Sequence, residues 1–145
     1  MVSADIIKKF VAQIKEKHKT ISEPTIEKDF YLTFLLNEIS KCIDENNKTP
    51  FSKLVFKGGT LLTRTHLNYH RISEDLDFTY IENEKLNKLS SKQRKKAIAI
   101  FTDDLTEEIN NISKKLNMDF STNKNDKKYC RVMDRKNVYV FRIYY

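Results

Sequence analysis

The spacing of apolar residues along the chain predicts three helices. Apolar side chains recur every three or four positions in segments 3–17, 24–45 and 90–116, the spacing that places them on one face of a helix. Pro24 suits the first turn of the second helix. Ser90 and Gln93 have the spacing of a capping box at the start of the third, which is the clearest helix of the chain.

Shorter apolar runs between and after these helices predict strands. The run 51–56 leads directly into Lys57-Gly58-Gly59-Thr60, which predicts a strand, a tight turn and then a short helix over 60–69. Segment 75–81 alternates between apolar and polar residues, as in a strand with two different faces. Three further strands are predicted over 118–122, 128–133 and 138–145. Two helices, a strand–turn–helix–strand unit, a long helix and a meander indicate an α+β fold.

The length and the glycine content narrow the class of protein. The 145 residues amount to one domain, 1–145. The chain contains only two glycines, and these are the adjacent Gly58 and Gly59. A dinucleotide-binding fingerprint and a Walker loop are excluded, because each needs glycines at spacings that this chain lacks. The Gly-Gly pair is therefore the first place to look for a function that needs a flexible backbone.

Charge and cysteine content point to a cytoplasmic protein with a polyanionic partner. The net charge of +7 favours nucleic acids or nucleotides, although a Lys-rich surface without such a role would give the same value. Cys42 and Cys130 are far apart and form no zinc motif, so reduced thiols are expected. No apolar run is long enough to cross a membrane or to form a signal sequence, and no membrane partner is expected.

The candidate chemistry lies in the glycine pair and in two acidic residues that follow it. Glycines let backbone amides approach a ligand closely, and amides at the start of a helix favour phosphate. Asp75 and Asp77 alternate with apolar residues, so both carboxylates lie on one strand face with their Cα atoms about 7 Å apart. Such a pair repels unless a cation neutralises it, and Mg²⁺ accepts carboxylate and phosphate oxygens. An isolated Asp-x-Asp is more often a solvated strand face.

These residues resemble a known family. A Gly-Gly turn followed by Asp-x-Asp is similar to the DNA polymerase β-like nucleotidyltransferase superfamily. The fuller pattern, Lys57-Gly58-Gly59-Thr60 and then Arg71-x-Ser73-Glu74-Asp75-Leu76-Asp77-Phe78, resembles the AbiEii/AbiGii toxin family. Glu27-Lys28-Asp29-Phe30-Tyr31 resembles a short motif of the same family. The alternative interpretation is that Glu27, Lys28 and Asp29 simply form the charged, solvent-facing side of a helix.

The resemblance implies a mixed β-sheet with helices packed on it and a metal-dependent nucleotidyltransferase. Family members act as toxins of bacterial toxin–antitoxin or abortive-infection systems, and some transfer nucleotides to tRNA. By motif match, the predicted catalytic and metal-binding residues are Asp75 and Asp77, with Mg²⁺ or Mn²⁺ as cofactor. The predicted nucleotide-binding residues are Lys57, Gly58, Gly59, Thr60, Arg71 and Ser73. The implied partners are an NTP, tRNA or another nucleic-acid acceptor, and a cognate antitoxin protein.

One feature departs from the pattern of the superfamily, which normally has a third carboxylate on a later strand. The last predicted strand, 138–145, contains no acidic residue, and Asp119 and Asp134 are poor substitutes because of their positions. We therefore expect the chain to be an N-terminal portion of a longer family protein. The alternative function is a truncated or degenerate fold without catalysis, which binds nucleic acid or a partner protein. Tyrosines and arginines of 129–145 either form a surface for single strands or pack in the core.

Overall fold

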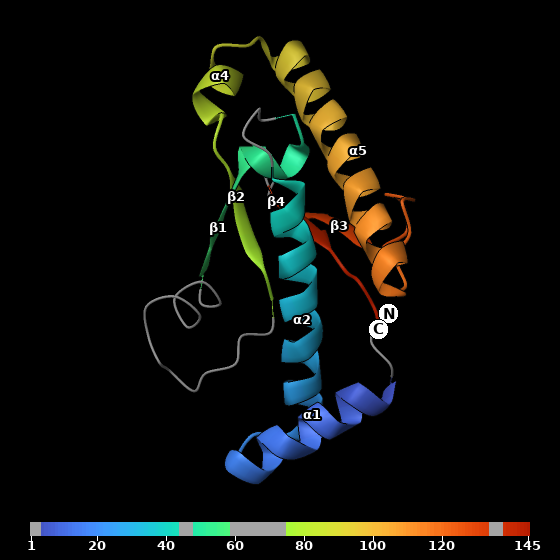
Figure 1. The fold of residues 1–145 in the computed structure, drawn as a ribbon. Helices are drawn as coiled ribbons and strands as arrows, with labels where there is room; N and C mark the ends of the chain where they lie inside the picture. Colours follow the sequence, from blue (N-terminus) through green and yellow to red (C-terminus); the bar gives the residue numbers. More distant parts are fainter. Residues whose placement is uncertain (1–3, 44–47, 59–74, 134–137) are drawn as a thin grey trace. The chain divides into compact units, whose positions relative to one another are not determined.

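The computed structural model describes residues 4–43, 48–58, 75–133 and 138–145 (Figure 1). The chain divides into two compact units, Met1–Asn83 and Glu84–Tyr145. The first contains α1 (Ala4–Lys17), α2 (Glu23–Cys42), the 3-10 turn η1 (Pro50–Lys53), β1 (Leu54–Lys57) and β2 (Asp77–Tyr80). The second contains most of α4 (Asn83–Asn87), then α5 (Ser91–Leu116), β3 (Cys130–Met133) and β4 (Val138–Phe141). The α+β class is confirmed, and both described strand pairs are antiparallel.

The first two helices pack through aromatic side chains. Figure 1 shows α1 lying across the N-terminal end of α2. The Phe30 ring lies 5.0 Å from the ring of Phe10 and 4.7 Å from that of Phe34, measured between centroids. Pro24 stands in the first turn of α2 as predicted, and the Ser22 side chain caps the helix by accepting from the Thr25 amide. These contacts bury the middle of the predicted apolar face.

Two isoleucines at the ends of predicted apolar helix faces are exposed, one near the start of α1 and one directly after α2. Ile6 is 55% exposed, because adjacent isoleucines point about 100° apart on a helix and its neighbour Ile7 takes the buried position. Ile43 is 52% exposed, because α2 ends at Cys42 and Ile43 is its extended C-cap residue. The predicted helix over 24–45 is therefore too long at its C-terminal end.

The strands of the first unit form an antiparallel pair, β1 with β2. In its register Leu54 faces Tyr80 and Lys57 faces Asp77. The rings of Phe56 and Phe78 stand opposite each other with 5.3 Å between centroids. The prediction of a strand from residue 51 is wrong at its start, because Pro50 begins a 3-10 turn in which Phe51 is buried.

The second unit is organised around α5. The predicted capping box is confirmed, since the Ser90 hydroxyl accepts from the Gln93 amide and the Gln93 side chain accepts from the Ser90 amide. The helix ends at Asn117, whose φ of 58° is left-handed. The buried residues of α5 all lie between Thr102 and Ser113: Thr102, Leu105, Thr106, Ile109, Asn110, Ile112 and Ser113.

The strands of the second unit are shorter than predicted. In the β3–β4 pair, Cys130 faces Phe141 and Met133 faces Val138. The predicted strand 118–122 is reduced to one bridge between Asp119 and Tyr144, because the chain turns at 123–126 instead of continuing alongside. None of the helices described here combines the length and the apolar composition needed to cross a membrane.

Candidate functional site

The candidate site is built where β1 ends and β2 begins. The antiparallel register sets Lys57, the last residue of β1, against Asp77, the first residue of β2. Gly58 follows Lys57 and has a φ of +83°, in the region that side chains rarely adopt. Strand pairing therefore brings the adjacent residues Lys57 and Gly58 close to Asp77, which follows Lys57 by 20 positions in the sequence.

The backbone of Gly58 lies against the carboxylate of Asp77. A Cβ atom added to Gly58 would stand 3.1 Å from both Cβ and Cγ of Asp77, and it would overlap the Oδ2 oxygen. Gly58 is needed here for two reasons, the positive φ and the lack of a side chain. The absence of that side chain leaves the space in which the Asp77 carboxylate lies.

The two aspartates both present their side chains to solvent. Asp77 starts β2, while Asp75 lies just before it, and the intervening Leu76 is half-buried. The predicted alternation of exposed acids and covered apolar residues is therefore present, although Asp75 is outside the strand itself. Carboxylate oxygens are the hard ligands that Mg²⁺ prefers, and Mg²⁺ sites typically use one or two carboxylates together with substrate phosphates. The pair fits such an ion on the chemistry of its donors.

A comparison with models of protein families identifies the family to which this chain belongs. The model of the nucleotidyl transferase AbiEii toxin family, of type IV toxin–antitoxin systems, matches residues 44–140. The chain belongs to the AbiEii family. No curated protein and no solved structure matches it.

The AbiEii match covers the candidate site and most of the second unit. It includes β1, Gly58, both aspartates and β2, and continues through α5 into β4. Membership supports the transferase class and implies a nucleotide substrate and a cognate antitoxin. The Glu27–Tyr31 motif precedes the matched region.

The nucleotide-binding roles of all six predicted residues in this AbiEii domain remain predictions, and the structure describes only Lys57 and Gly58 among them. Gly59, Thr60, Arg71 and Ser73 lie outside the residues that the structure describes. The predicted helix 60–69 lies outside them as well.

The Glu27–Tyr31 motif is partly explained by packing. It lies in the first half of α2, where Phe30 is buried between its aromatic neighbours. Burial raises the pKa of Tyr31, and the nearby carboxylate of Glu27 raises it further. The aromatic part of the motif therefore stabilises the α1–α2 packing, while a role of its charged residues in the site stays a prediction.

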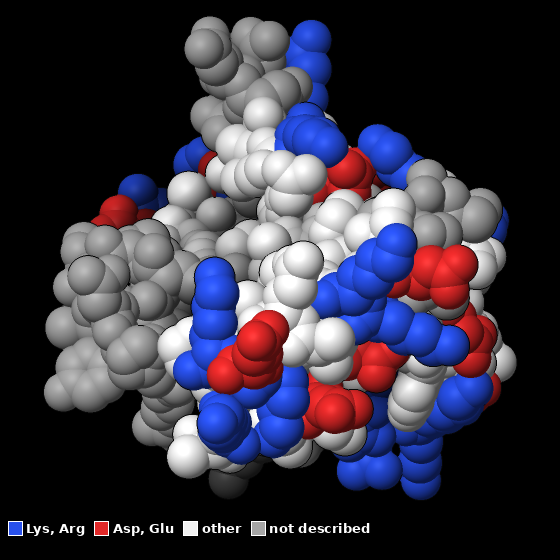
Figure 2. Space-filling view, turned by 60° about the horizontal axis from the view of Figure 1, so that its bottom comes forward, with Lys and Arg blue, Asp and Glu red and all other residues white. Residues whose placement is uncertain are grey.

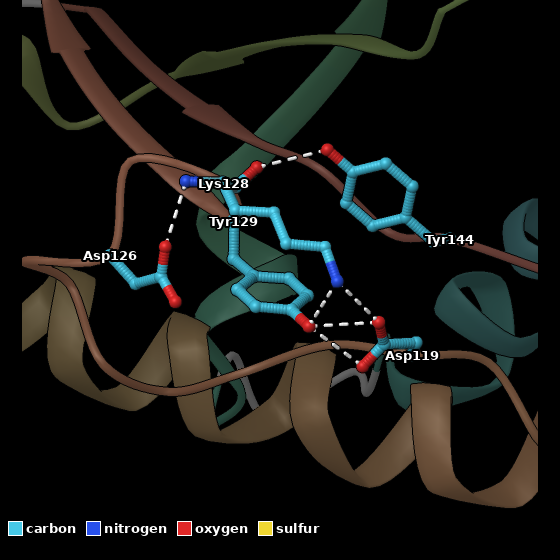
Figure 3. Close-up of polar contacts among 5 residues, drawn as sticks. All are labelled: Asp119, Asp126, Lys128, Tyr129 and Tyr144. Carbon is cyan, nitrogen blue, oxygen red and sulfur yellow. Dashed lines mark hydrogen bonds and ion pairs between the residues drawn. The ribbon is translucent and has the colours of Figure 1, made fainter.

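Asp119, weighed above as a third carboxylate, is held by a contact network within the second unit (Figure 3). Its Oδ2 accepts from the Lys128 ammonium at 2.8 Å, and both of its oxygens accept from the Tyr129 hydroxyl, at 2.8 and 2.9 Å. The Lys128 nitrogen also lies 4.4 Å from the centre of the Tyr129 ring and 4.8 Å from that of Tyr144. Sequence reasoning missed this network, since nothing in the sequence pairs Asp119 with Lys128 before the Asp119–Tyr144 bridge is known.

The network neutralises Asp119 without any metal ion. Hydrogen bonds from Lys128 and then Tyr129 hold the pKa of Asp119 below its ordinary value. The same contacts raise the pKa of Lys128. A carboxylate that is already paired with an ammonium gains less from a divalent cation, which agrees with its dismissal as a third metal ligand.

Replacing Lys128 with Met is expected to lower the melting temperature at pH 7, and to lower it less as the pH falls below about 4. The pKa of Asp119 is depressed in the folded state, so its contribution is present above the unfolded value of about 4 and is lost as the pH falls through the folded value. Thermal unfolding at pH 7, 4 and 2.5 measures this. Lys127→Met is the matched control and should show no such convergence. A difference for Lys128→Met that is the same at all three pH values would mean that packing on the two rings, rather than the ion pair, carries the effect.

Proposed function

We propose that this AbiEii-family domain transfers a nucleoside monophosphate from an NTP to a hydroxyl of a nucleic-acid acceptor such as tRNA. One observation carries the proposal: the Asp77 carboxylate lies against the backbone of Gly58, within the region that matches the family. The turn that would bind the phosphates and a carboxylate that would bind the metal ion are thereby adjacent. Such a domain would act in the cytoplasm, where NTPs, tRNA and a cognate antitoxin protein are found.

The chain's own residues would bind and orient the triphosphate. Lys57 is exposed at the end of β1 beside Asp77 and would contribute a positive charge. Gly58 and Gly59 would offer backbone amides, and Thr60, Arg71 and Ser73 would add donors from their side chains. Asp75 and Asp77 would hold Mg²⁺ or Mn²⁺, which when bound supplies charge neutralisation at the phosphates.

The reaction itself is a displacement at the α-phosphorus. A bond forms between the acceptor oxygen and the α-phosphorus, and the bond from that phosphorus to the bridging oxygen of the β-phosphate breaks. Pyrophosphate leaves with the electron pair of the broken bond, and the hydroxyl proton passes to water. The protein's contribution is to hold the two reacting groups in line and to stabilise the charge that develops.

A transfer assay tests the proposal directly. The protein is incubated with each NTP labelled at the α-phosphate, with total tRNA and with Mg²⁺. The expected result is label in RNA with one NTP preferred, equimolar pyrophosphate, and no transfer in EDTA. Label that appears in RNA equally in EDTA would contradict the metal role. Absence of transfer with every NTP and with both Mg²⁺ and Mn²⁺ would contradict the activity.

The second candidate is a non-catalytic family member that binds nucleic acid or a partner protein. It is favoured by the pairing of Asp119 with Lys128 and Tyr129, which leaves this carboxylate less suited to a metal ion. In the described part of the chain, no group of three His, Cys, Asp or Glu residues is placed to hold a metal ion. Thermal shift separates the two. Stabilisation by GTP or UTP that requires Mg²⁺ supports the enzyme, whereas stabilisation by RNA with none by any NTP supports the binding module.

A further inference from the structure

The excess positive charge of the chain is concentrated in one short stretch. Residues 85–96, called here the basic segment, contain six Lys and Arg residues and no Asp or Glu: Lys85, Lys88, Lys92, Arg94, Lys95 and Lys96. The chain has 27 basic and 20 acidic residues in all, so the rest holds 21 basic against 20 acidic residues. The net charge of +7 is therefore almost entirely local.

One face of the molecule illustrates this balance. On the face drawn in Figure 2, most Asp and Glu side chains have Lys or Arg side chains beside them. Within the basic segment, by contrast, no acidic residue is present to pair with the cations along the chain. Lys92, Arg94, Lys95 and Lys96 make no ion pair with any described residue.

The basic segment is also placed where its charge is unfavourable for folding. Its last four cations occupy the first two turns of α5, which have no acidic residue in the first turn. The positive end of the helix dipole repels cations there, and Lys92 repels Lys95 and Lys96 across one turn. Clustering cations against the dipole lowers stability and is therefore not explained by folding.

Nothing in this part of the chain is buried. No described side chain from Asn83 to Phe101 belongs to the core, and Ile100 is 52% exposed. The N-terminal part of α5 thus presents Lys92, Lys95 and Lys96 on one exposed cationic face. The other side of this part is half-buried and carries Arg94, Ala97, Ile98 and Phe101. From Thr102 onward the helix buries seven residues. An uncovered face with this charge is complementary to a regular array of negative charges.

We infer that the basic segment is a docking surface for the phosphate backbone of RNA. The choice of RNA rests on the proposed function, because the acceptor must be held while its hydroxyl reacts. Lys and Arg contacts to phosphates supply affinity without sequence specificity, and each contact releases a counterion. The surface would therefore hold an acceptor strand by its backbone, and any selection of the acceptor would come from elsewhere.

The test compares two pairs of adjacent lysines on the same helix. The variants are Lys95→Gln/Lys96→Gln and Lys114→Gln/Lys115→Gln, which remove equal charge from exposed positions of α5. The pairs are separated by about 28 Å along the helix axis, well beyond the screening length of about 10 Å at 0.1 M salt. The control pair lies in the last turn, where its cations favour the helix, so its loss should destabilise the protein more than loss of the first pair.

Binding is measured without NTP, by fluorescence anisotropy of a labelled tRNA transcript and of a labelled oligouridine at several salt concentrations. K95Q/K96Q is expected to weaken binding about 30-fold at 0.1 M salt and to reduce the salt slope by about 1.5. K114Q/K115Q should change the affinity by less than about threefold. Circular dichroism verifies that both variants retain their helix.

Each other outcome overturns the inference. Unchanged binding in K95Q/K96Q, or equal losses in both pairs, would show that the segment is not the docking surface. Poly-glutamate that binds as tightly as RNA, with the same dependence on Lys95 and Lys96, would indicate an acidic protein partner. Because no nucleotide is transferred in this assay, RNA binding that depends on the segment stands even if the transfer assay fails.

Discussion

Replacing Asp77 with Asn is expected to reduce the rate of nucleotide transfer about 1,000-fold while leaving the fold intact. The amide keeps the size of the carboxylate but loses its charge, and a carboxylate that holds a metal at a phosphoryl group contributes several kcal/mol to the transition state. Because Asp77 is exposed, the core does not depend on it. Single-turnover transfer with labelled NTP at saturating enzyme measures the rate.

The control for Asp77→Asn is the same chemical change at a distant exposed position. Asp104→Asn, on the exposed side of α5, removes one negative charge and should retain the wild-type rate. The melting temperatures of both variants should match that of the wild type closely. The Mg²⁺ concentration needed for half-maximal rate should rise only for Asp77→Asn. A wild-type rate in Asp77→Asn would show that Asp77 does not hold the metal ion.

Local signals in the sequence were sufficient to predict the three long helices α1, α2 and α5, but not the short α4. Ser90 and Gln93 form the predicted capping box, and Pro24 stands in the first turn of α2. Each of these features depends on residues within one turn of each other, so spacing alone determines it. Burial of Ile26 and Phe30 follows for the same reason, since these two residues are four positions apart and share one face of α2. Ile39 is buried as well, although it lies nine positions after Phe30 and therefore on the opposite side of the helix.

Features that depend on strand register could not be predicted from the sequence in the same way. The Gly-Gly turn and the Asp-x-Asp strand could be recognised separately, but nothing in the sequence shows that Lys57 faces Asp77. The closeness of Gly58 to the carboxylate follows from that register and from a φ of +83° together. The Asp119 network depends in the same way on the single bridge to Tyr144. These contacts join residues 9 to 25 positions apart, and local periodicity does not predict contacts over such separations.

Replacing Gly58 with Ala is expected to lower both the stability and the activity of the protein. Ala at a φ of +83° costs roughly 1 to 2 kcal/mol, and its Cβ would collide with the Asp77 carboxylate. Relief of the collision requires the carboxylate to rotate away from the turn, so the transfer rate should fall at least about tenfold, as expected for a misplaced catalytic group. Urea unfolding and single-turnover transfer measure the two effects.

A double-mutant cycle separates the collision from the backbone strain. Gly58→Ala is made in the wild type and in an Asp77→Ala background, where Oδ2 and Cγ of residue 77 are absent. The φ penalty is the same in both, because it belongs to residue 58 alone, so any difference in the free energy of unfolding measures the contact with the carboxylate. We expect Gly58→Ala to cost about 1 kcal/mol less in the Asp77→Ala background, within the range of contacting pairs. Equal costs would mean that the turn requires glycine only for its backbone conformation, and that the position of the Asp77 carboxylate is not set by Gly58.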